Sequence, residues 1–242
     1  MSPIVSKLLH ENASKIKTRM QSKVLEHLQI LPTEISSKIP PLRTKQKASI
    51  IVPLIDNGMG TENSLENLSI IFTKRAKNLN QHANEISFPG GHYDSSVDRD
   101  SLMNTALRET REELVPPEEK FNIFDDQNEF VDPRYDFSKN LIMLGQTESI
   151  PSAKLVPVTP YFAYFRHQIP NVEDLFPGNE SEVAKVFALT VHELLDIEDT
   201  MRIKRLGMNG PVFPTDHGDI WGLTALVLKP ILHEVLKPVF VK

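Results

Sequence analysis

The sequence contains no cysteine and only 10 glycines among its 242 residues. The lack of cysteine excludes disulfides, thiolate metal ligands and cysteine nucleophiles, and it is typical of a reducing compartment. No apolar run approaches the roughly 20 residues that a membrane-spanning helix needs, so we expect a soluble chain without a membrane span. Lysine and arginine number 27 against 32 aspartates and glutamates, a net charge of −5. That balance argues against nucleic acid as a partner, because proteins that bind its backbone are usually basic.

The rest of the composition is that of a globular protein. Hydrophobic residues make up 40% and charged residues 24%, and the length suffices for one sizeable core or two small ones. The 18 prolines outnumber the 10 glycines, which predicts stiff connections. Each glycine is therefore a candidate for a position where the backbone geometry requires it.

The first 45 residues are expected to form a helical extension and a linker. Apolar residues recur at three- and four-residue spacings over residues 5–29, interleaved with lysines, which predicts an amphipathic, mildly basic helix. Packing of this helix on the domain is the preferred interpretation, and a mitochondrial presequence is the alternative, against which Glu11 and Glu26 count. A loop with Pro32 and the Pro40-Pro41 pair follows. We therefore divide the chain into residues 1–45 and a domain of residues 46–242.

The domain is expected to combine strands and helices. Segments rich in Ile, Val and Leu predict strands, and periodic apolar segments predict helices. The expected strands are 48–55, 68–74, 141–146, 156–165 and 182–189, and the expected helices are about 100–114 and 219–236. We expect Asp219 near the N-cap of the last helix and Trp221 in the core in preference to stacking on an adenine. Strands on both sides of a central helix indicate an α+β fold or a sandwich with a mixed sheet.

The helix expected near residues 100–114 carries a cluster of acids. At about 100° per residue, Glu109, Glu112 and Glu113 fall within one arc of the helix, and apolar residues occupy the adjacent arc. Like charges at these spacings destabilise an isolated helix by about 0.2–0.5 kcal/mol per pair. A hard cation such as magnesium or manganese would convert this repulsion into binding, whereas a solvated acidic face is the alternative. The upstream pair Gly90-Gly91 favours the functional interpretation.

These residues resemble the signature box of the Nudix hydrolases. Arg108-Glu109 and Glu112-Glu113 occupy the Arg-Glu and Glu-Glu positions of that box, and Gly90-Gly91 precede them. Asp100 stands eight positions before Arg108, where the box has glutamate. The resemblance implies a Nudix-type α/β/α sandwich with a mixed β-sheet, here with the N-terminal helical extension.

The chain departs from the box in three places. The loop between Gly91 and Arg108 carries an insertion, so the box glycine has no strict equivalent. Thr110 replaces an aliphatic residue, and Val115-Pro116 replaces the final Gly-aliphatic pair. Pro116 can still end the helix, because the residue before a proline is steered away from helical geometry.

A second resemblance points to the coenzyme A diphosphatase branch of this superfamily. Its upstream signature is matched by Ile71-Phe72-Thr73-Lys74-Arg75-Ala76 and by Phe88-Pro89-Gly90-Gly91 in the same register. Asn80 and Asn84 replace an arginine and a glycine of that signature. The two resemblances together span roughly residues 48–236, including segments around Glu182 and Trp221.

The resemblance implies metal-dependent hydrolysis of a diphosphate bond, with Mg²⁺ or Mn²⁺ as cofactor. Glu109 and Glu113 are the leading metal ligands and Glu112 the third. Glu112, Glu182 and Arg108 are the catalytic candidates: Arg108 as the group that holds a carboxylate in place, and Glu182 as general base or extra ligand. The alternative for Glu182 is a plain surface glutamate. Arg75, Gly90 and Gly91 are the candidate substrate-binding residues.

The implied substrate is coenzyme A or a derivative, split into 3',5'-ADP and 4'-phosphopantetheine. Oxidised nucleoside triphosphates such as 8-oxo-dGTP, or ADP-ribose, are the alternatives, because the box alone does not select a substrate. A catalytically silent nucleotide-binding module is a second alternative. We expect an intracellular protein with no nucleic-acid partner. Coenzyme A chemistry suggests peroxisome or mitochondrion, with the cytoplasm as alternative, and the C-terminus lacks a Ser-Lys-Leu signal. The sequence does not indicate an oligomeric state.

Overall fold

An eight-stranded mixed β-sheet forms the centre of the molecule. The computed structural model describes residues 3–25, 46–58, 66–79, 81–115, 140–203 and 208–240. Five strands follow the order β8–β2–β1–β7–β5, with β1 and β7 parallel and the other pairs antiparallel. Three short strands join them: β3 beside β2, β4 beside β1 and β6 beside β7. The strands are β1 (Ala48–Asp56), β2 (Leu68–Arg75), β3 (Ile86–Ser87), β4 (Gly90–His92), β5 (Leu141–Gln146), β6 (Ile150–Pro151), β7 (Pro157–Gln168) and β8 (Val183–Thr190).

The sheet opens between β1 and β2 at one end. The two strands pair where Leu54 lies opposite Ile70, but further along β2 pairs with β3 and β1 pairs with β4. The connection between the two short strands is tied to β1 because the Ile51 N–H donates to the Pro89 carbonyl at 2.9 Å. The opening therefore holds the segment that contains Gly90 and Gly91 inside the sheet.

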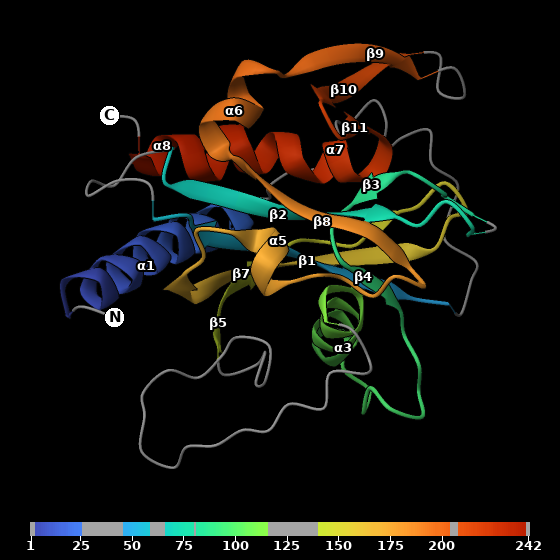
Figure 1. Cartoon of the computed structure of the whole chain (residues 1–242), viewed down its shortest axis with the longest axis horizontal. Coiled ribbons are helices and arrows are strands. Elements are labelled where there is room, and N and C mark those ends of the chain that lie inside the picture. The colour runs from blue at the N-terminus through green and yellow to red at the C-terminus, as the bar shows by residue number, and fades with distance from the viewer. Residues whose placement is uncertain are drawn as a thin grey trace.

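Helices cover both faces of the sheet (Figure 1). Helix α3 (Leu102–Leu114) lies on one face. On the other face lie α1 (Pro3–Leu25), α6 (Val191–Asp196), α7 (Gly222–Pro230), the π-helical turn η1 (Ile231–Leu236) and α8 (Lys237–Phe240). Side chains of β1 alternate between the two faces of the sheet and so contribute to two hydrophobic cores. Ile51 and Ile55 pack on the α3 side, whereas Val52 and Leu54 pack on the α7 side. The arrangement is the predicted α/β/α sandwich with a mixed sheet.

Helix α1 is packed against this sandwich. Leu9, Ala13, Ile16 and Met20 are at most 2% exposed and belong to the same core cluster as α7. The Arg19 Nε–H donates to the Glu234 carbonyl at 2.9 Å, which ties α1 to η1. The predicted N-terminal helix is thus present, and its apolar stripe completes one layer of the sandwich. The proline loop at 32–41 lies outside the described residues, and the division at residue 45 stays a prediction.

A small antiparallel sheet lies above α7. It consists of β9 (Asp199–Ile203), β10 (Met208–Thr215) and β11 (Gly218–Ile220), which the sequence did not predict. Asp219 lies in β11 and pairs with Pro214 of β10. The helix expected from residue 219 therefore begins at Gly222, and its N-cap residue, Trp221, makes no capping hydrogen bond with its side chain. The expected cap at Asp219 is therefore wrong. Among the described helices, none is long and apolar enough to cross a membrane.

Trp221 is on the surface. Its relative exposure is 45%, so the expectation that it packs in the core is also wrong. The apolar run that follows Trp221 is buried from Thr224 onward in α7. The tryptophan precedes the first turn of that helix and does not share the helix's buried face.

Candidate active site

Helix α3 carries the candidate carboxylates, and both of its ends are held from outside the helix. At its start the Ser101 side chain accepts a hydrogen bond from the Asn104 N–H at 3.3 Å. At its end the carbonyls of Glu113 and Leu114 accept from the N–H groups of Asn179 and Gly178 at 2.9 and 3.1 Å. These bonds satisfy carbonyls that a helix end leaves free, without the final glycine of the box. Pro116, the expected helix stop, lies outside the described residues.

The three carboxylates of α3 differ in burial. Glu112 is 53% exposed, Glu109 is 19% exposed and Glu113 only 2%. Glu113 faces the end of β2, where its Oε2 accepts from Thr73 Oγ1 at 3.3 Å and its Oε1 lies 3.6 Å from Arg75 Nη1. The carboxylate side of the helix therefore faces the opening in the sheet, and its innermost member is enclosed.

Burial dominates the electrostatics of Glu113. Loss of hydration, with smaller contributions from the negative charges of Glu182 and Glu109, raises the pKa of this carboxyl to about 8 against the opposing effects of Arg75 and Thr73. Burial also raises the pKa of Glu109, Arg108 opposes it, and Glu112 and Glu182 add to the rise. The backbone holds Glu182 near the end of α3, since its N–H donates to the Asn179 carbonyl and the Asn179 N–H donates to the Glu113 carbonyl, both at 2.9 Å. The role of Glu182 as general base or extra ligand stays a prediction.

Two glycines allow the loop before α3 to pass close to its neighbours. A Cβ atom on Gly91 would lie 2.3 Å from Glu109 Oε2, well inside van der Waals contact. Gly90 has φ +149°, and a Cβ there would lie 2.3 Å from the Ser49 carbonyl oxygen. Only glycine fits either position without a shift of the neighbouring atoms. The loop backbone therefore approaches the Glu109 carboxylate directly, as expected from the paired glycines.

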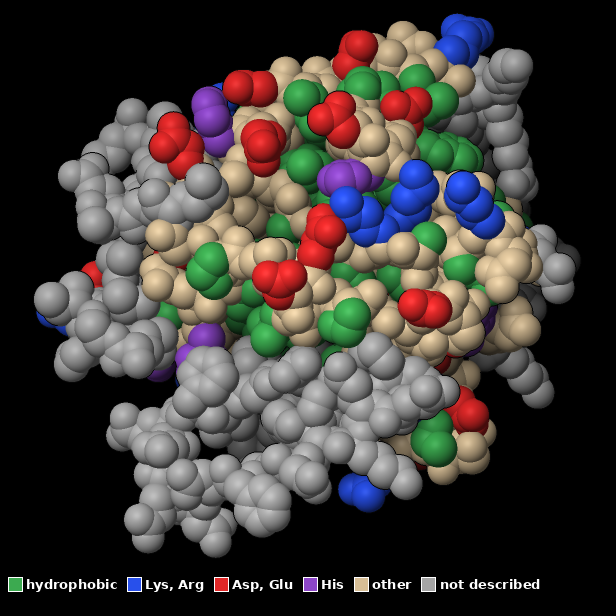
Figure 2. All heavy atoms as spheres, in the orientation of Figure 1, with side chains coloured by type: hydrophobic (Ala, Val, Ile, Leu, Met, Phe, Trp, Pro, Cys, Tyr) green, Lys and Arg blue, Asp and Glu red, His purple; other side chains and the backbone are tan. Residues whose placement is uncertain are grey.

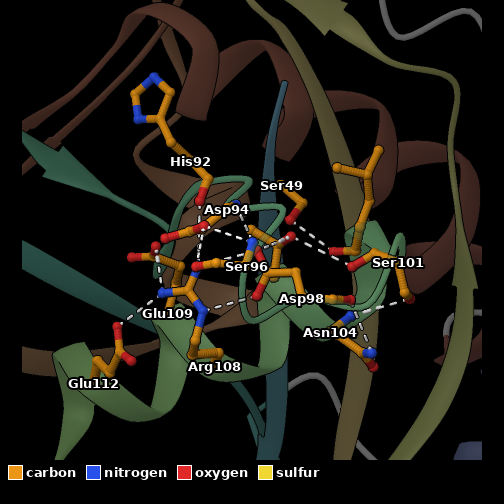
Figure 3. A network of polar contacts seen from close by, with 12 residues as sticks. Ser49, His92, Asp94, Ser96, Asp98, Ser101, Asn104, Arg108, Glu109 and Glu112 are labelled. Carbon is orange, nitrogen blue, oxygen red and sulfur yellow. Dashed lines mark hydrogen bonds and ion pairs between the residues drawn. The ribbon is translucent and has the colours of Figure 1, made fainter. Parts of the chain in front are cut away.

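Arg108 organises the solvent side of the cluster (Figure 3). Its Nη1 donates to Glu109 Oε1 at 2.8 Å and to Glu112 Oε2 at 3.0 Å, and its Nη2 donates to the His92 carbonyl at 3.2 Å. One guanidinium thus holds two of the candidate carboxylates and the end of β4, the strand that contains the two glycines. This matches the expectation that Arg108 orients its neighbours.

The acid that pairs with Arg108 is Asp98. Arg108 donates through Nε to Asp98 Oδ1 at 2.8 Å and through Nη2 to Asp98 Oδ2 at 3.1 Å. Asp98 is 1% exposed, and it also accepts from the Asp94 N–H and from Thr105 Oγ1, both at 2.8 Å. These donors, Arg108 first, lower the pKa of Asp98 to about 2. The carboxylate is therefore a buried, ionised anchor for Arg108.

Asp100, which stands where the box has glutamate, is not the acid that pairs with Arg108. Asp100 is exposed and accepts a hydrogen bond from the Tyr93 hydroxyl at 2.8 Å, away from Arg108. Backbone φ angles of +49° at Arg99 and +54° at Asp100 show that the inserted loop turns sharply just before the helix. Counting back from Arg108 therefore fails across this insertion. The three aspartates at 94, 98 and 100 were the sequence signal that the acid paired with Arg108 could be one other than Asp100.

Arg75 lies at the edge of the cluster and not in free solvent. Its side chain is 27% exposed and forms an ion pair with Glu113. The next residue, Ala76, donates its N–H to the Glu182 carbonyl at 2.8 Å, so β2 and the loop before β8 meet here. Sequence reasoning found Arg75 and Glu182 but missed Thr73 as a hydrogen-bond partner of Glu113.

A group of basic residues lies at the same end of β2 and β8. Lys74 and Lys185 are cross-strand partners, and Figure 2 shows basic side chains gathered beside a histidine on this face. Lys74 Nζ donates to the His217 carbonyl at 2.7 Å, while Lys185 Nζ lies 2.9 Å from Glu173 Oε1. Both ammonium groups therefore already have oxygen partners next to the candidate site.

The cluster has the donor chemistry for a hard cation. Glu109, Glu112, Glu113 and Glu182 supply only oxygen atoms, which suit magnesium or manganese. As they stand, the Arg108 guanidinium binds Glu109 and Glu112, and within the described ranges no three acidic or histidine side chains form a ready metal-binding group. The buried carboxyl of Glu113 is the feature that fits a cation, because its raised pKa means that its ionised form lacks a sufficient partner, with Arg75 Nη1 3.6 Å away.

Sequence comparison identifies the relatives of this chain. No protein-family model matches it. It is 29% identical over 196 residues to proteins named "Uncharacterized Nudix hydrolase NudL" from Yersinia pestis and Yersinia pseudotuberculosis, across 79% of this chain and 81% of theirs. These relatives support its place in the Nudix hydrolase superfamily. Their names agree with the predicted enzyme class, a Nudix-type hydrolase. The relatives are bacterial, so they lend no support to the expected organelle locations.

Solved structures of Nudix proteins resemble the chain more distantly. A NUDIX hydrolase from Alicyclobacillus acidocaldarius is 18% identical with a TM-score of 0.44, over 84% of this chain and 98% of that chain. A MutT/nudix family protein from Enterococcus faecalis is 14% identical with a TM-score of 0.43, over 84% and 64%. Likeness at this level says nothing about the site or its substrate.

Proposed function

We propose that the protein hydrolyses the diphosphate bond of coenzyme A or a coenzyme A derivative, producing 3',5'-ADP and 4'-phosphopantetheine. The observation that carries this proposal is the contact between two signature residues and the innermost carboxylate. Thr73 and Arg75 belong to the segment that resembles the coenzyme A diphosphatase branch, and they lie 3.3 and 3.6 Å from Glu113. The part of the chain that suggests the substrate therefore adjoins the part that suggests the chemistry.

We assign the cation to the carboxylates of α3. Glu109 and Glu113 would hold Mg²⁺ or Mn²⁺, with Glu112 as the third ligand. When bound, the cation supplies charge neutralisation of the diphosphate and lowers the pKa of a coordinated water molecule. The buried carboxylate of Glu113 supports this assignment, because a charge removed from water needs a compensating partner.

The other residues of the cluster orient the carboxylates and bind the substrate. Arg108 holds Glu109 and Glu112 in place while Asp98 anchors Arg108 from the buried side. Gly90 and Gly91 leave room for the diphosphate next to Glu109, where any side chain would intrude. Arg75 is the candidate to contact a substrate phosphate, since a guanidinium pairs well with phosphate oxygens.

Glu182 is the candidate to accept a proton from the attacking water. The water oxygen forms a new bond to one phosphorus, the bond from that phosphorus to the bridging oxygen breaks, and the bridging oxygen leaves with the other phosphate. Glu182 is half-buried, and its carbonyl accepts from the Ala76 N–H next to Arg75 at 2.8 Å, which supports this assignment. A role as an additional metal ligand is the alternative for this residue.

The test is a substrate panel. The protein is incubated with coenzyme A, ADP-ribose or 8-oxo-dGTP in the presence of Mg²⁺ or Mn²⁺, and products are separated by chromatography. We expect 3',5'-ADP and 4'-phosphopantetheine from coenzyme A, and loss of these products in Glu113→Gln. The matched control is Glu180→Gln, an exposed glutamate two residues before Glu182, which should retain turnover.

The other outcomes distinguish the alternatives. Preferential turnover of 8-oxo-dGTP or ADP-ribose would keep the reaction and replace the substrate. No turnover of any compound, together with nucleotide binding, would leave a catalytically silent nucleotide-binding module.

A further inference from the structure

Residues 178–182 connect elements that carry the proposed site. This loop follows the short helix α5 (Val172–Leu175) and precedes β8. On one side its backbone caps α3, through the bond from the Asn179 N–H to the Glu113 carbonyl at 2.9 Å. On the other side the Glu182 carbonyl accepts from the Ala76 N–H at 2.8 Å, one residue after Arg75. Glu113, Glu182 and Arg75 come from three separate elements, and backbone bonds of this loop join all three.

The loop has a defined internal turn. Asn179 Oδ1 accepts from the Ser181 N–H at 3.2 Å and from the Ser181 hydroxyl at 2.7 Å. The Asn179 carbonyl accepts from the N–H groups of Glu182 at 2.9 Å and Val183 at 2.7 Å. An asparagine side chain that bonds two residues ahead stabilises a tight turn. The Asn179 side chain thus stabilises the turn, and its carbonyl binds the start of β8.

The turn fixes the point from which the Glu182 side chain leaves the loop. Glu182 is half-buried, its N–H donates to the Asn179 carbonyl at 2.9 Å, and its own carbonyl accepts from the Ala76 N–H at 2.8 Å. Glu182 sits at the end of a loop, where a side chain can move unless the backbone is tied down. The hydrogen bonds of Asn179 fix that backbone relative to the end of α3. They therefore set the separation of Glu182 from Glu113.

We propose that Asn179 is a positioning residue, which holds Glu182 against the carboxylates of α3 for the hydrolysis. The inference deepens the proposed function and rests on it. In this role Asn179 contacts neither substrate nor cation, and it acts through the turn. Its loss should therefore affect the turnover step more than the binding of substrate.

The experiment compares three variants of the full chain. Asn179→Ala removes the Oδ1 acceptor, and Asn179→Asp retains an acceptor of the same length. Asn171→Ala is the matched control, because Asn171 Oδ1 makes similar bonds to the N–H groups of Glu173 at 3.1 Å and Asp174 at 3.4 Å but caps α5 instead. Thermal unfolding of each variant shows that it is folded before kinetics are measured.

We expect Asn179→Ala to lower kcat about tenfold with KM within about twofold, because misplacement of a reacting group affects the chemical step. Asn179→Asp should restore most of kcat, and Asn171→Ala should behave as wild type. Unchanged kcat in Asn179→Ala would overturn the inference. An equal loss in Asn179→Ala and Asn171→Ala would do the same, because it would indicate a general loss of stability.

A second measurement does not depend on turnover. Mn²⁺ is titrated into each variant, and free Mn²⁺ is followed by electron paramagnetic resonance. The same turn caps the end of α3 at Glu113, a proposed ligand, through the Asn179 N–H. We therefore expect binding about tenfold weaker in Asn179→Ala, the size usual for groups that orient ligands, and unchanged binding in Asn171→Ala. If wild type hydrolyses none of the compounds, the proposed function fails, and equal Mn²⁺ affinity in wild type and Asn179→Ala would then separately overturn the role of Asn179.

Discussion

Asp98 and Arg108 form a two-point ion pair beneath the carboxylate cluster, with contacts of 2.8 and 3.1 Å. The pair links the inserted loop to α3, and Asp98 is the buried partner. Through Arg108 the pair extends to Glu109 and Glu112. A change at Asp98 should therefore disturb both stability and the orientation of the site.

Replacement of Asp98 by alanine should lower the free energy of unfolding by about 3 kcal/mol, because it leaves Arg108 without its buried partner. Urea unfolding followed by circular dichroism gives this quantity. Asp100→Ala is the control, since Asp100 is exposed and should change stability by less than about 0.5 kcal/mol. The reverse order of effects would show that Asp98 is not the acid that anchors Arg108.

The same pair predicts how stability depends on acid. The pKa of Asp98 is lowered from 3.8 to about 2 in the folded protein. Above 3.8 the carboxylate is ionised in both states and its contribution is complete, whereas it is lost as the pH falls from 3.8 through about 2. Urea unfolding between pH 5 and pH 2 should therefore show a steeper acid loss in wild type than in Asp98→Asn. Parallel profiles would contradict this.

Glu113→Gln should separate activity from stability. The pKa of Glu113 is raised from 4.5 to about 8, so between these values only the unfolded state releases the proton and wild type loses stability as the pH rises. Glutamine removes this loss. Without divalent cation, the Tm of Glu113→Gln should exceed that of wild type by a margin that grows from pH 5 to pH 8, while turnover falls at least about a hundredfold. Glu112→Gln, at an exposed position, should show no such pH-dependent margin.

Gly91→Ala should abolish most turnover, because its Cβ would lie 2.3 Å from Glu109 Oε2 and displace that carboxylate. Gly145→Ala is the matched control in β5, where the nearest atom to a new Cβ is Met20 Cε at 3.7 Å. Steady-state kinetics and Tm are measured for both. Retention of full activity by Gly91→Ala would show that close approach of the loop to Glu109 is not needed.

Ile16→Ala should destabilise the whole domain by about 2–5 kcal/mol, because Ile16 is fully buried in the core shared by α1 and α7. Lys17→Ala, at the adjacent exposed position, should have little effect. Chemical unfolding monitored by tryptophan fluorescence and circular dichroism makes the comparison. An Ile16→Ala variant as stable as wild type would favour a detachable targeting or regulatory segment.

The hydrophobic patterns predicted most of the central elements. The strand expected at 141–146 has these bounds in the structure, β1 and β2 each extend one residue beyond the expected end, and β8 is shifted by one residue at both ends. The signal for these strands lies within each segment, since their β-branched residues favour extended backbone and burial on both faces. The β9–β11 sheet was missed because prolines and glycines interrupt β10, and its strands are stabilised by pairing over α7.

The sequence by itself determined the acidic helix, the paired glycines and the resemblance to a hydrolase superfamily, because these reside in short-range spacing along one segment. Only the tertiary structure decided that Asp98 and not Asp100 pairs with Arg108, since an insertion changes the path of the loop. It also decided how deeply Glu113 is buried and how Asn179 joins α3 to Glu182. Those features depend on backbone contacts between segments far apart in the chain, which no local pattern encodes.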